Sequence, residues 1–364
     1  MKPSSPIFFV TSRTARWMWS WRRWYCTTVL TVQDLRGPPK FPPRPHVVIL
    51  GAGASKAAFP NGDKCHRVVP LMNGLPDVIG KPWRDLLIDA RPPVDGFEEQ
   101  FSWLRRQGHY EHELLKIEDG IASHFESLVL PDHPTIYDYI VLGLRPKDVV
   151  ATFNWDPFLP LAHKRNRAVA ALPDIRFLHG CVGFATCPEH DILGSPSEIC
   201  PQCRRRLVRS KLFFPDQDKD YTKDSTVNRD WRFVAERLKR AFHLTIFGYS
   251  GPATDYKAKA LLLEGWSKTP FRDVSHVEII DIKDGDELRK HWKQFIPFNH
   301  DMVCPDFWDS TIARWPRRTQ DYKLSASLYG LPSEYLGPLR TESLHELQDW
   351  HAALAESEKQ KSGG

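Results

Sequence analysis

The sequence predicts a doubly wound α/β fold, in which helices cover both faces of a mainly parallel β-sheet. Short, continuous apolar runs recur along the chain, as is typical of strands that are buried on both faces. Segments in which apolar residues have helical spacing lie between these runs, for example 97–128 and 230–241. Strands that alternate with helices favour parallel pairing through crossover connections. The expected strands are 46–50, 148–153, 175–178, 243–247 and 276–280.

The composition is that of an ordinary globular protein, and it does not predict binding to nucleic acid. Its 364 residues are 41% hydrophobic and 26% charged, and the formal net charge is +5. Binding to phosphate backbones needs Lys and Arg clustered on one face. The densest basic run, 204–206, is interpreted as a solvated loop.

Cysteine usage and hydropathy indicate a reducing, cytoplasmic location. The seven cysteines are an odd number and do not suggest a disulfide framework. No apolar stretch reaches the ~18 residues that indicate a transmembrane segment. Arginines interrupt the apolar residues near the amino terminus, which therefore lacks the apolar centre of a secretory signal.

Three regions follow from the changes in composition along the chain. Residues 1–45 are rich in Trp, Arg and Pro and are predicted to be a poorly ordered arm. A membrane-surface or partner-binding arm and an over-long start to the chain are the alternatives. Residues 46–300 form the predicted main domain, and 301–364 a partly helical extension whose last helix begins near Glu342.

A glycine turn follows the first expected strand, with the sequence Gly51-Ala52-Gly53-Ala54-Ser55. Glycines at such a turn allow backbone N–H groups to approach a pyrophosphate. A tight strand-to-helix turn without a ligand is the structural alternative. Lys56 occupies the third glycine position of the dehydrogenase fingerprint, and no clear acidic residue ends a second strand ~20 residues later. A dinucleotide site other than that of a hydride-transfer enzyme is therefore favoured.

Polar residues follow four of the expected strands directly. Each alone has a structural interpretation, because Asn and Asp favour turns and helix caps and a lone His is usually packed or hydrogen-bonded. Together they are expected to converge on one crevice, since ligands of doubly wound sheets bind beyond the carboxyl ends of the strands. The motifs at these strand ends contain Thr152, Asn154 and Asp156, then His179, then Gly248 and Ser250, and finally Asp281.

A cysteine pattern between 181 and 212 predicts a small zinc-bearing module. Cys187 and His190 form one pair, and Cys200 and Cys203 form a second pair, with nine residues between the two pairs. Zinc favours four tetrahedral S and N ligands, and two-residue spacers allow each pair to hold one ion. Cys181 is an alternative to His190, and free buried thiols are the alternative to a metal. A site with four protein ligands is closed, so the zinc is expected to be structural.

The order and spacing of these motifs resemble the sirtuins and their SIR2-like relatives. That family reads Gly-Ala-Gly-x-Ser, Thr-x-Asn-x-Asp, His-Gly, two cysteine pairs and Gly-x-Ser, and the matching motifs here cover roughly residues 46–285. The resemblance implies a Rossmann-like domain with a helical insertion and a zinc module, and NAD bound between the parts. It implies NAD contacts for Gly51, Ala52, Gly53, Ser55, Thr152, Gly248, Ser250 and Asp281.

Departures from the deacylating sirtuins bear on the acceptor of the reaction. The Gly-Ile-Pro-Asp-Phe-Arg stretch that follows their first motif is missing, and Phe153 replaces the Gln before the motif Asn. Pro215 lies where those enzymes pair with an acyl-lysine peptide, and proline lacks the N–H that strand pairing needs. The chain is more similar to bacterial SIR2-like proteins of anti-phage defence, which hydrolyse NAD.

The resemblance predicts that Asn154, His179 and Asp156 act at the nicotinamide–ribose bond. His179 is the expected base, because histidine titrates near neutral pH. Asn154 is expected to hold a ribose hydroxyl or the attacking water, and Asp156 to orient the site or stabilise positive charge. An NAD-dependent lysine deacylase and a non-catalytic NAD or ADP-ribose module are the two alternatives. An NAD-consuming enzyme must be held inactive in a healthy cell, and a homo-oligomer is one candidate means.

Overall fold

The computed structural model describes residues 44–190, 192–194, 198–214, 220–252, 255–268, 272–298, 300–320 and 339–362. The chain divides into two units, Met1–Pro43 and Arg44–Gly364. Only the second unit contains described residues. The predicted arm, 1–45, therefore lies outside them except for Arg44 and Pro45.

A six-stranded sheet forms the centre of the second unit, and all of its neighbouring strands are parallel. The predicted doubly wound α/β fold is thereby confirmed. Every residue of the central strand β1 is buried, which explains why its sequence is a continuous apolar run. The strands are β1 His46–Leu50, β2 Val149–Thr152, β3 Asp174–Phe177, β7 His243–Phe247, β8 His276–Ile280 and β9 Asp301–Cys304.

The strand order is β3-β2-β1-β7-β8-β9. The chain first builds outwards from β1 to β3, then returns to place β7 on the other side of β1. Doubly wound sheets with this order bind ligands at the point where the order reverses, beyond the carboxyl ends of the two central strands. The turns that follow β1 and β7 therefore lie at this switch point.

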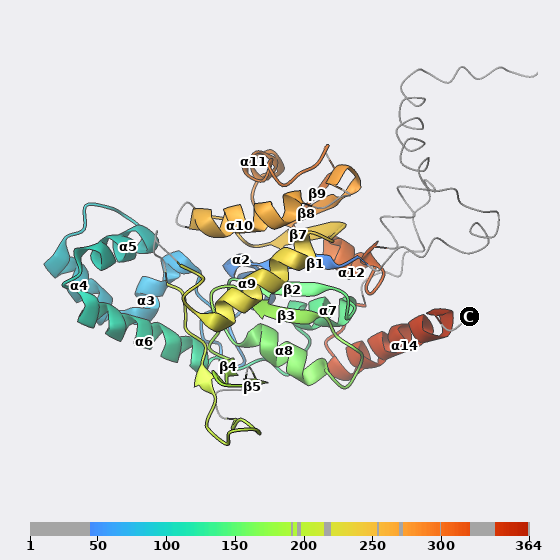
Figure 1. Ribbon diagram of the computed structural model, residues 1–364, viewed down its shortest axis with the longest axis horizontal. Helices are drawn as coiled ribbons and strands as arrows, with labels where there is room; N and C mark the ends of the chain where they lie inside the picture. Colours follow the sequence, from blue (N-terminus) through green and yellow to red (C-terminus); the bar gives the residue numbers. More distant parts are fainter. Residues whose placement is uncertain are drawn as a thin grey trace, which may run out of the picture. The chain divides into compact units, whose positions relative to one another are not determined.

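Helices cover both faces of the sheet (Figure 1). Apolar residues of α2, α7 and α8 pack with Val48, Leu50 and Val150 on one face. Those of α9 and α10 pack with Val47 and Ile49 on the other. The flanking helices are α2 Ala52–Ala58, α7 Ile136–Gly143, α8 Phe158–Asn166, α9 Ser225–Leu238, α10 Tyr256–Ser267, α11 Gly285–His291 and α12 Thr311–Arg314.

A helical insertion lies between α2 and α7 and joins the first apolar core. The predicted segment 97–128 forms two helices, because Gly108 adopts a left-handed conformation with φ of 76° and ends the first of them. Acidic residues begin α5 and basic residues end it, which complements the helix dipole. The insertion contains α3 Leu75–Ile79, α4 Lys81–Ala90, α5 Phe97–Gln107 and α6 Glu111–Ser127, with the short 3-10 helix η1 Met72–Gly74 before them.

A second, three-stranded antiparallel sheet carries the cysteine pairs. Its order is β5-β4-β6, and its strands are β4 Ala185–Thr186, β5 Leu193–Gly194 and β6 Val208–Arg209. Ala185, Leu207 and two of the cysteines form a small apolar cluster of their own. This module is too small to bury a large core, so a cross-link by a metal would stabilise it.

The carboxyl-terminal region takes part in the main sheet, so the boundary predicted at residue 300 needs correction. β9 pairs with β8 through the partners Val277 and Asp301 up to Ile280 and Cys304. Two 3-10 helices, η3 Arg272–Val274 and η4 Phe307–Asp309, flank these strands. The last helix, α14, spans Leu344–Ser362, close to the start expected near Glu342.

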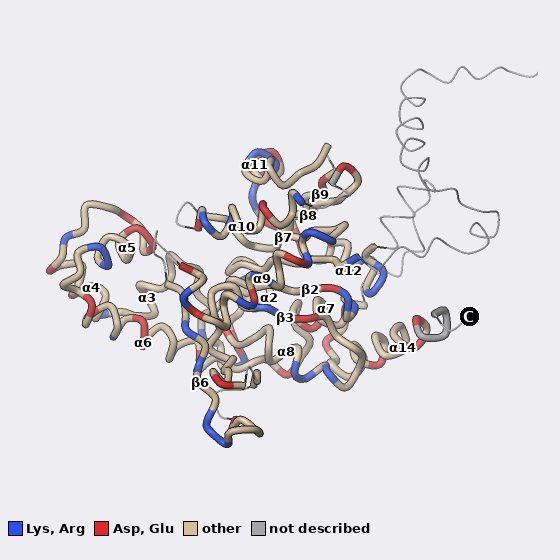
Figure 2. The backbone as a smooth tube through the Cα atoms, in the orientation of Figure 1, with Lys and Arg blue, Asp and Glu red and all other residues tan. Residues whose placement is uncertain are grey.

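Charged residues of both signs are interspersed along the helices (Figure 2). Among the helices of the described residues, none combines the length and the apolarity that crossing a membrane requires.

Acid is expected to destabilise the protein through His351, a buried residue of α14. Its Nδ1 lies 3.0 Å from the carbonyl oxygen of Leu347, and burial is the main cause that lowers its pKa from 6.5 to about 4. Between pH 6.5 and pH 4 the unfolded chain therefore binds more protons than the folded protein. The free energy of unfolding falls as the pH drops from 6.5 towards 4. The full effect corresponds to about 3 kcal/mol.

Urea unfolding of the wild type and of His351→Leu between pH 7 and pH 4 measures this contribution. We expect the difference in unfolding free energy between the two proteins to change across that window. An unchanged difference would show that His351 does not titrate differently in the folded and unfolded states.

Candidate functional site

The turns after β1 and β7 lie in direct backbone contact at the switch point. The N–H of Gly51 donates to the carbonyl oxygen of Phe247 at 2.9 Å, and that of Gly53 donates to Gly248 at 2.9 Å. Gly248 has a φ of 59°, and a Cβ added to it would lie 2.2 Å from the backbone nitrogen of Ala54. Backbone packing between the two turns thus requires glycine here even without a ligand.

Asn154 follows β2 and points its amide into the turn after β1. Its Nδ2 donates to the carbonyl oxygen of Gly51 at 2.9 Å, which fixes the orientation of the amide. The same nitrogen lies 2.9 Å from Ser55 Oγ and 3.1 Å from the hydroxyl of Tyr137. Thr152 helps to shape the turn, because its Oγ1 accepts from the N–H of Asn154 at 2.9 Å.

Ser55 joins Asn154 to Asp156. Its Oγ donates to Asp156 Oδ2 at 2.6 Å and lies 2.6 Å from the hydroxyl of Tyr137. The chain turns after β2, so that Asn154 and Asp156, with one residue between them, both reach this serine. We call Ser55, Tyr137, Asn154 and Asp156 the serine network; all four residues are buried.

Burial raises the pKa of Asp156 from 3.8 to about 6, while the hydrogen bond from Ser55 and the N–H of Phe158 oppose this shift. Ionising a carboxyl group in a low-dielectric site costs free energy unless hydrogen-bond donors stabilise the charge. Asp156 is therefore mainly ionised at neutral pH and becomes protonated in mild acid. Such a perturbed group at the ligand-binding edge of a sheet is a candidate functional residue.

His179 follows β3 and belongs to a second group of polar residues. Its Nε2 lies 2.9 Å from the hydroxyl of Tyr221 and 3.9 Å from Asp255 Oδ1. The hydroxyl of Tyr249 donates to Asp255 Oδ2 at 3.4 Å. Burial is the main cause that raises the pKa of Tyr221, so this phenol stays protonated at neutral pH. We call His179, Tyr221, Tyr249 and Asp255 the histidine cluster.

Phe153 connects the histidine cluster to the segment that carries Asn154. Its ring stacks on Tyr249 with centroids 4.2 Å apart and meets His179 edge-on at 4.7 Å. Phe153 packs in the second apolar core, whereas Tyr137 packs in the first. The strand-end residues thus form two groups that reach the carboxyl edge from different faces of the sheet.

Ser250 and Asp281 are predicted contacts that belong to neither group, although Ser250 directly follows Tyr249 in sequence. Ser250 is exposed. Asp281 follows β8 and is half-buried, and its Oδ1 accepts from the N–H of Lys283 at 3.1 Å. In this structure Asp281 therefore stabilises its own turn.

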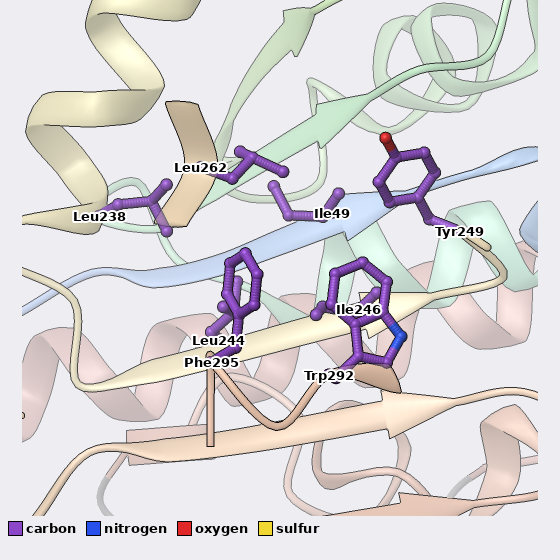
Figure 3. Close-up of a pocket in the computed structure, with 8 residues that line it drawn as sticks. All are labelled: Ile49, Leu238, Leu244, Ile246, Tyr249, Leu262, Trp292 and Phe295. Carbon is purple, nitrogen blue, oxygen red and sulfur yellow. The ribbon is translucent and has the colours of Figure 1, made fainter. Parts of the chain in front are cut away.

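An apolar gap lies beneath the second turn, between the sheet and helices α9 and α10 (Figure 3). It has no room for a water-sized sphere, so it is a packing defect and not a ligand site. Tyr249 borders this gap with its ring, while its hydroxyl points away (Figure 3). None of the predicted site residues lines it.

The predicted metal ligands are brought together in the small sheet. Cys187, His190, Cys200 and Cys203 offer ligand atoms that all lie within 4.8 Å of one another. Cys187 Sγ is 3.4 Å from His190 Nδ1 and 3.6 Å from Cys203 Sγ. Ligands around tetrahedral zinc are about 3.5–3.8 Å apart, given Zn–S of about 2.3 Å and Zn–N of about 2.0 Å. The donor set and its spacing therefore fit one zinc ion.

The geometry also decides between the two alternatives for the fourth ligand. Cys181 lies outside the group, and its thiol donates to the carbonyl oxygen of Asp156 at 3.1 Å. Burial raises the pKa of this thiol, which disfavours the thiolate that a metal needs. His190 is the residue that completes the set.

Removing one ligand is expected to release the metal. We expect purified wild-type protein to contain about one zinc per chain and Cys200→Ser to contain much less, because three ligands hold the ion weakly. Elemental analysis measures this, with Cys65→Ser, at an exposed free cysteine, as the matched control. Wild-type protein with reduced thiols and no metal would contradict the assignment.

Tyr137, Tyr221 and Asp255 are site residues that the sequence motifs did not predict. Tyr137 lies in the apolar run of α7, where an aromatic residue is expected to be core, and no sequence signal distinguishes it. Tyr221 lies in a turn before α9 and Asp255 is the N-cap residue of α10, and neither directly follows a strand. Tyr249 was within the Gly248–Ser250 motif, and its position between two motif residues was the one available signal.

No protein-family model and no curated protein matches the sequence. Solved structures of Sir2 enzymes resemble the fold. One is Sir2 in complex with an inhibitor, 2'-O-acetyl-ADP-ribose and a deacetylated p53 peptide, at 13% identity and a TM-score of 0.35, covering 79% of this chain and 94% of that chain.

A second solved structure, concerned with the mechanism and regulation of Sir2 enzymes, has 14% identity and a TM-score of 0.34 and covers 71% of this chain and 86% of that one. A Sir2 homologue in complex with NAD has 12% identity and a TM-score of 0.31, with 86% and 89% covered. At these values the interpretation of the site depends on this chain's own contacts.

Proposed function

We propose that this protein binds NAD at the carboxyl edge of its main sheet and hydrolyses the nicotinamide–ribose bond. The observation that carries this proposal is the serine network, which links the turn after β1 to Asn154 and to the buried carboxyl group of Asp156. It lies at the switch point of a sheet whose strand order is that of dinucleotide-binding folds.

The reaction requires the site mainly to position the substrate and to stabilise the charge that develops on the ribose. When the bond between ribose C1' and the nicotinamide nitrogen breaks, the electron pair goes to the nitrogen and the ring becomes neutral. The ribose passes through an oxocarbenium-like state, as in glycoside hydrolysis. Water then adds to C1' and loses a proton, so the products are nicotinamide, ADP-ribose and one proton.

Each of the three residues has a role that its contacts support. The serine network uses only the amide nitrogen of Asn154, so its oxygen is the atom that would accept from a ribose hydroxyl or the attacking water. The buried carboxylate of Asp156 would stabilise the positive ribose, because charges interact strongly where water is excluded. His179 Nε2 would accept the proton from water, in place of its hydrogen bond to Tyr221.

The remaining contacts are proposed with the dinucleotide lying across the switch point. Ala52 and Ser55 at the start of α2, with Gly51, Gly53, Gly248 and Ser250, would lie along the phosphates, and Asp281 would meet the adenosine ribose. The N–H groups of Gly51 and Gly53 already donate within the protein. These two residues would therefore allow the phosphates to approach the backbone closely but would not donate hydrogen bonds to them.

Water is the proposed acceptor, and an acyl-lysine peptide is the alternative. The missing Pro-Asp-Phe-Arg stretch and the aromatic Phe153 support hydrolysis. Pro215, the third departure, lies outside the described residues. By the same sequence resemblance, we propose that depletion of NAD serves anti-phage defence.

Nicotinamide release from NAD, with and without an acyl-lysine peptide, tests the proposal. We expect equal release in both reactions, with ADP-ribose as the second product. Release that requires the peptide would establish the deacylase instead. Thermal stabilisation by NAD without any turnover would establish a binding module.

A further inference from the structure

Tyr137 extends the serine network from the helix α7. Its side chain is fully buried, and its hydroxyl lies 2.6 Å from Ser55 Oγ and 3.1 Å from Asn154 Nδ2. No substrate atom can reach so buried a phenol without a rearrangement of the core around it. Any effect on the reaction must therefore pass through Ser55 and Asn154.

The donors and acceptors of the network can be satisfied in one direction only. An amide nitrogen can only donate, so Asn154 donates to Tyr137, and an ionised carboxylate can only accept, so Asp156 accepts from Ser55. The single proton of Ser55 is thereby used, and Ser55 Oγ can only accept from Tyr137. The phenol proton of Tyr137 thus points at Ser55 Oγ, and this hydrogen bond opposes rotation of the serine hydroxyl away from Asp156.

The helix that carries Tyr137 is held in place independently of the site. Thr135 and Asp138 form a capping box at the start of α7. Asp138 also accepts from Arg165 Nε at 2.6 Å and from Asn166 Nδ2 at 2.7 Å, which ties α7 to α8. A phenol on so well-anchored a helix can hold the hydroxyl of Ser55 in one rotational position.

We propose that Tyr137 is a positioning residue for the reaction, which holds the Ser55 hydroxyl on Asp156 and the Asn154 amide in its productive orientation. This inference rests on the proposed function. Without the phenol, Ser55 loses a donor that opposes its rotation away from Asp156. The two N–H protons of Asn154 keep Gly51 O as an acceptor, but the second then depends on the less restrained hydroxyl of Ser55. Both changes act on kcat more than on KM, because they disturb groups that are needed in the transition state.

Loss of the Tyr137 hydroxyl should also change the pKa of Asp156. The hydrogen bond from Ser55 lowers the pKa of Asp156, in opposition to burial. Weakening that bond raises the pKa further, so the carboxylate forms only at higher pH. The acid limb of the pH–rate profile should therefore move to higher pH in a variant without the phenol.

Tyr137→Phe tests the inference, and Tyr139→Phe is the matched control. Tyr139 lies on the same helix, and its substitution by Phe also removes one hydroxyl. That hydroxyl accepts from the N–H of Thr341 at 3.2 Å, away from the serine network. We expect Tyr137→Phe to lower kcat about tenfold, the equivalent of one hydrogen bond, with little change in KM. Its acid limb should move to higher pH, while Tyr139→Phe should keep the wild-type profile.

Equal kcat and equal acid limbs in the two variants would overturn the inference. A common fall in kcat with an unmoved acid limb would show only a structural role for both phenols. Thermal unfolding of both variants separates loss of fold from loss of positioning.

A second measurement does not depend on turnover. The carboxyl carbon of Asp156, assigned with Asp156→Asn, is titrated by carbon-13 NMR in the wild type and in both phenol variants. We expect a raised pKa in Tyr137→Phe alone, and an unchanged one would contradict the inference. If the wild type releases no nicotinamide, the proposed function fails, whereas this titration still decides whether Tyr137 controls the network.

Discussion

Replacing His179 by alanine is expected to lower nicotinamide release by at least about a hundredfold. A positioned general base contributes about a hundredfold to ten-thousandfold, and alanine has no atom that can accept the proton. Asn154→Ala should have an effect of similar size, because it removes the amide that holds the ribose or the water. Initial rates with saturating NAD and no peptide measure both effects.

The histidine prediction has a matched control in His124→Ala on α6. His124 Nε2 contacts the carbonyl oxygen of Val68 at 3.0 Å, within the helical insertion and away from both polar groups. This variant should keep the wild-type rate. A His179→Ala protein that is folded and still hydrolyses NAD at the wild-type rate would remove His179 from the reaction.

Gly248→Ala is expected to destabilise the fold by more than about 4 kcal/mol or to prevent folding. The left-handed backbone costs about 1–2 kcal/mol for a residue with a Cβ. The larger cost is steric, because the new Cβ would lie 2.2 Å from Ala54 N and 2.4 Å from the carbonyl carbon of Gly53, both backbone atoms. To relieve these contacts, the turns after β1 and β7 must separate. Equilibrium unfolding in urea measures the change.

Substitutions at two other glycines separate the backbone contribution from the steric contribution to this free energy. Gly108 also has a positive φ, of 76°, but nothing lies within 4 Å of an added Cβ, so Gly108→Ala should cost only the backbone term. Gly120 lies within α6 with the same open surroundings, and Gly120→Ala should stabilise the helix by up to about 1 kcal/mol. If Gly248→Ala cost no more than Gly108→Ala, the close contact between the turns would be refuted.

The features that could be predicted from sequence are those that depend on neighbouring residues. Buried strands such as β1 and β7 were evident as apolar runs because helices cover both faces of this sheet. The cysteine pairs were evident because two-residue spacing by itself allows each pair to hold one ion. Gly108 divided a predicted helical segment, and β9 extended the sheet past residue 300, because helix ends and edge strands have weaker local signals.

The partners of the site residues could not be predicted in this way. Asn154 and Ser55 are 99 residues apart in sequence, and His179 and Tyr221 are 42 residues apart. Tyr137 belongs to a mainly apolar helix, as a purely structural core residue would, and only the tertiary structure places its hydroxyl next to Ser55.

Local periodicity and spacing were enough to predict the class of fold, the residues at the strand ends and the two residue pairs of the small module. Only the tertiary structure decided that His190 and not Cys181 completes the cysteine group, and that the strand-end residues divide into a serine network and a histidine cluster. The physical reason is that a hydrogen bond needs atoms within about 3 Å. For residues that are distant along the chain, the packing of α2, α7 and the loops against the sheet sets that distance.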